Sequence, residues 1–136
     1  MRKQVYASDF VKFEFDEDTS IFYEDWSSNL SKEEVYKQEV MNKKDLVLRH
    51  HPKNILDDIS HCDFSIHPEL QNWTEEILGP AFMEIGLERY AILLPSDLFT
   101  QVSMEQTADE FIERNEGMQV NYFESFQEAE NWLKAN

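Results

Sequence analysis

The sequence predicts an α/β protein with a mostly parallel five-stranded sheet, in which an N-terminal hairpin supplies one antiparallel strand, and about four helices. The main observation is that strand-like and helix-like segments alternate in the order β-β-α-β-α-β-α-β-α. A length of 136 residues, with three Gly, four Pro and no internal repeat, suits a single domain over 1–136. We treat residues 1–9 as an N-terminal extension that need not be ordered.

An antiparallel hairpin is expected at residues 11–24. Val11, Phe13 and Phe15 alternate with charged side chains, which is typical of a half-buried strand. The polar residues 16–19 supply a turn, and residues 20–24 form the returning strand.

The next segment predicts a helix followed by a parallel strand. Ser31 and Glu34 form a capping box, and the helix must end before Pro52 because the residue before a proline avoids the α region. Its inward side chains are expected to be Tyr36, Val40 and Val47. A helical connection of this length, between the hairpin and residues 54–59, favours a right-handed parallel crossover.

A second helix is expected to begin at Pro68 and to end at Gly86, since proline suits the first helical position and glycine suits the C-terminal cap. Gly79 and Pro80 should kink or interrupt this helix. Residues 89–94 then form the most apolar strand of the chain, which we place at the centre of the sheet.

Two further helices flank the last strand. A capping box at Ser103–Gln106 begins a helix that ends at Gly117, and Ser125 caps the final helix. Between them, residues 118–122 alternate between apolar and polar side chains. This strand should therefore have one wetter face and lie near an edge of the sheet.

The charge of the chain limits its partners. Its net charge of −16 repels the phosphates of nucleic acids, which are therefore excluded as partners. Residues 1–53 carry nine basic and eleven acidic side chains, whereas residues 54–136 carry three and seventeen. If the acidic part forms one face, that face favours a basic protein partner; a merely solubilising surface is the alternative.

The sequence also bears on the compartment and on cofactors. Cys62 is the only cysteine, so no internal disulfide can form. The polar N-terminus does not match a signal peptide, and the longest apolar stretch, residues 90–94, is far too short to span a membrane. We expect a cytoplasmic protein without a membrane span. Three scattered glycines cannot build a phosphate-binding loop, and no cofactor is predicted.

Several stretches carry a family resemblance. The element order, together with Tyr122–Leu133 (YFESFQEAENWL), resembles the SpoIIAA-like superfamily, which contains the STAS domains. Ile55–Asp58 (ILDD), Ile66–Trp73 (IHPELQNW) and Val102–Gln106 (VSMEQ) are similar to small bacterial proteins of that superfamily, described as STAS-like or as related to CRAL-TRIO lipid-binding domains. The similarity covers most of the chain. It implies a SpoIIAA-like fold and a non-catalytic regulatory or scaffolding role.

The phosphorylation site of the superfamily does not carry over. In its anti-sigma factor antagonists, the modified serine lies in an Asp-Ser-Ser-Gly motif, whereas the matching residues 58–65 contain neither the serine pair nor the glycine. Phosphorylation of Ser60 or Ser65 is still feasible, because the added negative charge would lie near the N-terminus of the helix at Pro68. Unmodified loop serines are the alternative.

The candidate binding residues follow from the predicted sheet. Ligands of open parallel sheets bind outside the carboxyl ends of the strands, where we expect one common rim. The candidate ligand- or partner-binding residues on this rim are Trp26, Asp57, Asp58, Ser60, Ser96 and Asp97. Adjacent strand residues point to opposite faces, so for Asp57 and Asp58 we favour capping or loop bonding over a shared acid–base role.

Metal binding is not predicted. His61, Cys62 and His67 have donor atoms that zinc accepts, but their spacing matches no zinc signature. They remain weak metal candidates, with ordinary loop residues as the alternative.

We therefore expect a non-catalytic regulatory or protein-interaction module, which binds a protein partner through the loops at the C-terminal ends of its strands. The alternative is a small binding protein for a lipid-like apolar ligand, motivated by the CRAL-TRIO similarity and by an apolar content of 41%. The sequence does not identify the partner, and a homodimer is one assembly that it leaves open.

Overall fold

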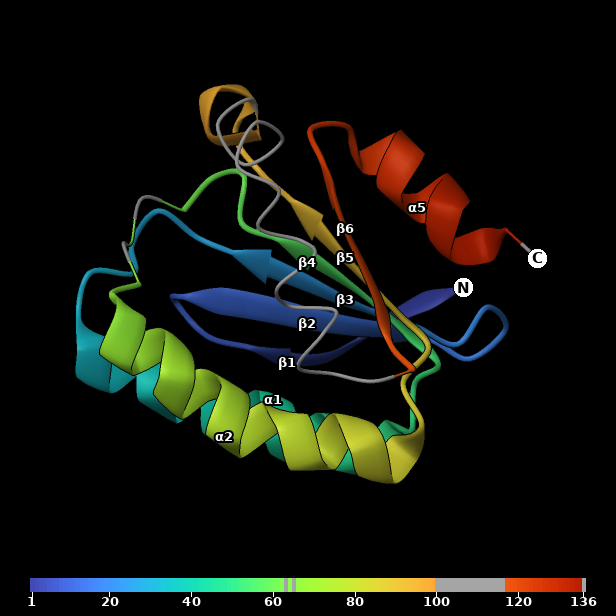
Figure 1. The fold of residues 1–136 in the computed structure, drawn as a ribbon, viewed down its shortest axis with the longest axis horizontal. Helices are drawn as coiled ribbons and strands as arrows, with labels where there is room; N and C mark the ends of the chain where they lie inside the picture. The colour runs from blue at the N-terminus through green and yellow to red at the C-terminus, as the bar shows by residue number, and fades with distance from the viewer. Residues whose placement is uncertain (63, 65, 100–116, 136) are drawn as a thin grey trace.

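The computed structural model describes residues 1–62, 64, 66–99 and 117–135. Its centre is a six-stranded mixed sheet with the strand order β1-β2-β3-β4-β5-β6 (Figure 1). The strands are β1 (Arg2–Ala7), β2 (Val11–Asp16), β3 (Ile21–Trp26), β4 (Asn54–Asp58), β5 (Arg89–Leu93) and β6 (Gln119–Phe123). Strands β3 to β6 pair in parallel, which confirms the mostly parallel α/β sheet.

The prediction of a five-stranded sheet is wrong, because the sheet has six strands and β1 is the additional one. Arg2–Ala7, expected as an extension, pair antiparallel with β2, with a register shift between Gln4 and Tyr6. This strand is mostly exposed, so few of its side chains carry the period-two burial signal on which the prediction depended. Tyr6 is partly buried and stacks on Phe13, with ring centroids 5.6 Å apart.

The hairpin of β2 and β3 is confirmed. The two strands pair antiparallel from Val11 opposite Trp26 to Asp16 opposite Ile21. The carboxylate of Asp16 accepts the backbone N–H of Asp18 at 2.9 Å, which holds the turn.

Helix α1 (Glu33–His50) has the predicted length and buried face, but not the predicted cap. It buries Tyr36, Val40 and Val47 and ends before Pro52, as expected. The Ser31 capping box is wrong: Lys32 is the N-cap residue and makes no side-chain cap bond. The first helical hydrogen bond runs from Tyr36 N to Lys32 O, so Ser31 lies one residue too early to cap.

Helix α2 (Pro68–Ile85) lies beside α1 on the same face of the sheet (Figure 1). It begins at Pro68 and is capped by Gly86 at φ 67°, both as predicted. The helix runs through Pro80, so the predicted interruption does not occur. Pro80 cannot donate a backbone hydrogen bond, which costs the helix free energy. Burial of Leu78, Ala81 and Phe82 on the inner face of α2 offsets this cost.

The positions of β5 and β6 in the sheet were also predicted from the sequence. Strand β5 lies between β4 and β6 and not at the centre, whereas β6 is an outer strand as predicted. β5 is apolar because helices cover both of its faces: α1 and α2 on one side, and α5 (Phe126–Lys134) on the other (Figure 1). Ser125 caps α5 by accepting the N–H of Glu128, as expected. The helix expected from Ser103 lies outside the described residues.

Candidate binding cavity

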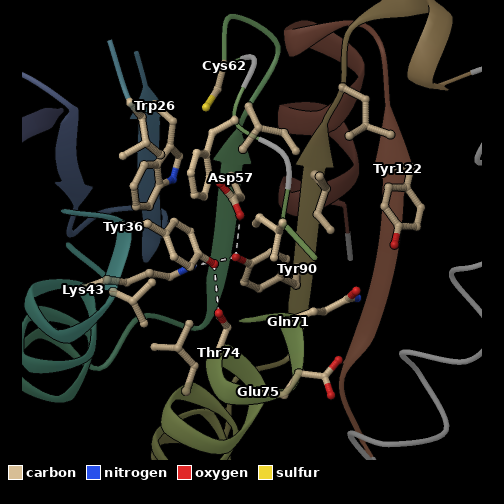
Figure 2. A pocket seen from close by; sticks show the side chains of 18 of the residues that line it. Trp26, Tyr36, Lys43, Asp57, Cys62, Gln71, Thr74, Glu75, Tyr90 and Tyr122 are labelled. Atoms are coloured by element: carbon tan, nitrogen blue, oxygen red, sulfur yellow. Dashed lines mark hydrogen bonds between the residues drawn. The ribbon is translucent and has the colours of Figure 1, made fainter. Parts of the chain in front are cut away.

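A cavity of about 560 Å³ lies between the sheet and the two helices α1 and α2. Most of its wall is apolar or aromatic, and its side chains come from β3, α1, β4, α2, β5, β6 and the segments that follow β3, β4 and β5 (Figure 2). The apolar and aromatic residues of this wall include Trp26, Leu30, Tyr36, Val40, Ile59, Leu78, Phe82, Ile92, Leu94 and Tyr122. Residues at or after the carboxyl ends of β3, β4 and β5 therefore contribute to the wall of this cavity.

A buried charged network lies at one side of this cavity. Lys43 Nζ of α1 lies 2.7 Å from Glu24 Oε2 of β3, and it donates to the Tyr90 hydroxyl at 2.7 Å. Tyr90 in turn donates to Asp57 Oδ2 at 2.7 Å, and Trp26 Nε1 donates to Glu24 Oε1 at 3.0 Å. Figure 2 shows Lys43, Asp57 and Tyr90 pointing toward one another from α1, β4 and β5.

Among the described residues, one carboxylate oxygen of this network has neither a hydrogen bond nor an ion pair. Asp57 Oδ1 is buried and accepts no hydrogen bond of normal geometry within the part of the chain that the structure describes. The indole N–H of Trp26, which donates to Glu24, also lies near the Asp57 carboxylate and opposes the rise of its pKa. Beside it, the Tyr36 hydroxyl is 3.0 Å from Thr74 Oγ1, and Thr74 donates to the backbone carbonyl of Leu70 in α2. The cavity thus has an unused acceptor in an otherwise bonded polar group, which is unusual for a buried carboxylate.

Burial determines the protonation of the network. Glu24 is 1% exposed, and its burial, aided by the nearby charge of Asp57 and opposed by Lys43, raises its pKa to about 7. Burial likewise raises the pKa of Asp57. Burial and then the Asp57 and Glu24 charges raise the pKa of Tyr90, so its phenol stays protonated and donates to Asp57. Two carboxylates share one ammonium, which leaves a formal charge of −1 when both are ionised.

The structure brings some of the predicted binding residues together and leaves others apart. Trp26 and Asp57 both line the cavity. Asp58 instead accepts the N–H and the hydroxyl of Ser60, at 3.0 and 2.5 Å, which is the local loop bonding expected of one member of the carboxylate pair. Ser96 and Asp97 lie in a helical turn at 96–99 and are outside the cavity wall.

The weak metal candidates are also separated. Cys62 lines the cavity, whereas His67 caps α2 and places its Nε2 2.6 Å from Glu33 Oε1. Within the described ranges, no three side chains of His, Cys, Asp or Glu converge on one point. Ser65, a phosphorylation candidate, lies outside the described residues, and Ser60 is the donor to Asp58.

Sequence reasoning did not select Glu24, Lys43 or Tyr90. A signal for two of them was present, because Lys43 follows Val40 by three residues on the buried helical face and Glu24 interrupts an apolar strand. A lone charge on an apolar face indicates a buried partner. Pairing the two required knowledge of how α1 crosses the sheet.

Comparison of the chain with family models, with curated proteins and with solved structures found no match. No helix in the described part of the chain is long and apolar enough to cross a membrane. The fold and the site together define an α/β protein with a mixed six-stranded sheet and an internal cavity with a buried charged network.

Proposed function

We propose that this protein is a non-catalytic binding protein for a small, lipid-like apolar ligand, which occupies the cavity between the sheet and helices α1 and α2. The observation that carries the proposal is the cavity itself. Its volume of about 560 Å³ and its largely apolar wall match the sites that take small molecules, which are concave, mostly apolar and contain a few polar groups.

Access to the cavity is from the carboxyl ends of the strands. Ile66, before α2, and Leu98, after β5, both contribute to the wall and are 42% and 39% exposed. Apolar side chains that are exposed at the border of a cavity favour passage of an apolar ligand. Trp26 contributes from β3 but is buried, so it contacts a ligand from inside the cavity.

Native mass spectrometry of freshly purified protein, followed by solvent extraction, tests this function. The expected result is a bound apolar molecule, or uptake of an added apolar probe with one site per chain. An Ile92→Trp variant fills the cavity from β5 and should lose the bound mass, whereas Met41→Trp, on the exposed face of α1, should keep it. A folded protein that neither carries nor takes up any apolar molecule would contradict the proposal.

A regulatory protein-interaction role at the same loops is the second candidate. The exposed Ile66 and Leu98 support it, since a partner could cover both side chains. The SpoIIAA-like relationship, from which such a role would follow, stays a prediction. In a pull-down experiment, the wild type should then capture a protein partner that Leu98→Asp does not capture. Met83→Asp is the control and should still capture it, because Met83 is exposed on α2 and is not part of the cavity wall.

A further inference from the structure

The charges around the cavity favour one kind of ligand head group. We infer that the apolar ligand carries an ammonium group, and that this group binds the free oxygen of Asp57. The inference rests on the proposed function and names the ligand class for that same cavity.

The only cation of the described cavity wall is already engaged. Lys43 is 3% exposed, and its Nζ contacts Glu24 Oε2 and the Tyr90 hydroxyl at 2.7 Å each. Its ammonium also lies over the rings of Phe82 and Tyr90, 5.7 and 5.0 Å from their centroids. An anionic head group would have to displace Glu24 from Lys43, so Lys43 does not provide an anion site.

Asp57 offers the complementary group. Its Oδ2 accepts from Tyr90, whereas its buried Oδ1 has no hydrogen-bond partner among the described residues. A donor from the ligand would satisfy this acceptor, and a charged donor would also balance the negative charge that remains when Glu24 and Asp57 are both ionised.

The aromatic wall favours the same head group. Trp26, Tyr36 and Tyr90 line the cavity around Asp57, and Trp26 and Tyr36 pack with ring centroids 5.8 Å apart (Figure 2). Aromatic faces attract cations through their quadrupole, most strongly in a site shielded from water. An ammonium therefore finds a carboxylate and π faces together, whereas a hydroxyl gains only the hydrogen bond.

A chain-matched series separates these head groups. Decylamine, decanol and decanoate are titrated into the full-length protein below their aggregation concentrations, and dissociation constants are measured by calorimetry near neutral pH. We expect decylamine to bind about tenfold more tightly than decanol, and decanoate to bind most weakly, because a charge-assisted hydrogen bond is worth more than a neutral one. In Asp57→Asn, decylamine should fall to the affinity of decanol, while decanol changes little.

Asp58→Asn is the matched control, since Asp58 is the neighbouring carboxylate and bonds to Ser60 instead of lining the cavity. It should keep the full preference for decylamine. Decanol or decanoate binding as tightly as decylamine would overturn the inference but leave the proposed function intact. A preference that persists in Asp57→Asn would overturn the role of Asp57. Binding of none of the three would refute the proposed function itself, and the wild-type series decides the preference even if Asp57→Asn does not fold.

Discussion

The two faces of the sheet are packed in different ways. One face is covered by α1 and α2, helices of 18 residues each, and encloses both the larger core and the cavity. The other face is covered by α5, a helix of nine residues, over a small cluster of closely packed side chains. These are Ile21, Tyr23, Leu56, Ala91, Ala129 and Leu133. The longer helices therefore lie over the cavity, and the short helix covers the opposite face.

The same strands serve both faces. On β3, the Tyr23 hydroxyl donates to Glu130 of α5 at 2.8 Å, whereas the next residue, Glu24, pairs with Lys43 of α1. On β4, Leu56 belongs to the α5 cluster, and Asp57 faces the cavity. The period of two along a strand places residues of the α5 cluster and residues of the cavity face next to each other in the sequence.

Removing the buried cation should cause the largest loss of stability. Lys43→Met leaves Glu24 and Asp57 without their compensating charge, and we expect the free energy of unfolding to fall by about 3–5 kcal/mol. Unfolding by a chemical denaturant measures this loss of stability. Lys44→Met, on the same helix but away from the network, should change stability by only about 0.5 kcal/mol. A loss of similar size in both variants would show that the contacts of Lys43 with the network do not stabilise the fold.

Truncations on the two faces should differ. Leu133→Ala removes a buried side chain from the closely packed α5 cluster and should cost about 3 kcal/mol. Ile92→Ala enlarges a cavity that already exists and should cost about 1 kcal/mol, because fewer contacts are lost there. Equal losses in chemical denaturation would contradict the difference in packing.

Stability should depend on pH through the cavity face. The folded state raises the pKa of Glu24 from 4.5 to about 7, so it holds this proton more tightly than the unfolded chain does. The free energy of unfolding should therefore decrease as pH rises through this window, by about 3 kcal/mol. Asp57 acts in the same direction, since its pKa is also raised. In Glu24→Gln, the free energy of unfolding should decrease less steeply with rising pH. If the variant and the wild type show the same pH dependence, Glu24 is not its source.

The smallest effect is expected on the opposite face. Ser125→Ala removes the cap that accepts the N–H of Glu128 and should cost about 1 kcal/mol, measured by thermal unfolding. Ser125→Asp, which retains an acceptor, is the control and should stay close to wild type. Apolar-ligand binding should persist in both variants, because α5 does not line the cavity.

The sequence was sufficient where the relevant interactions are local. The hairpin of β2 and β3, the caps of α2 at Pro68 and Gly86, and the stripe of α5 depend on residues a few positions apart. β1 was missed because it is held by pairing with β2 and few of its own side chains are buried. The Ser31 cap was wrong because the helix begins at Glu33, which makes Lys32 the N-cap residue. Trp26 and Asp57 were selected by a rule about parallel strands, which the observed pairing of β3, β4 and β5 satisfies.

By itself, the sequence determined the α/β class, the parallel run of β3 to β6, and two residues of the cavity wall. Only the tertiary structure decided that Lys43 meets Glu24 and Tyr90, and that one oxygen of Asp57 accepts no hydrogen bond from the described residues. Helical and strand periodicities report which face of an element is buried, but not which distant element covers it. Charges far apart in the chain become one network only when the layers pack and water is excluded.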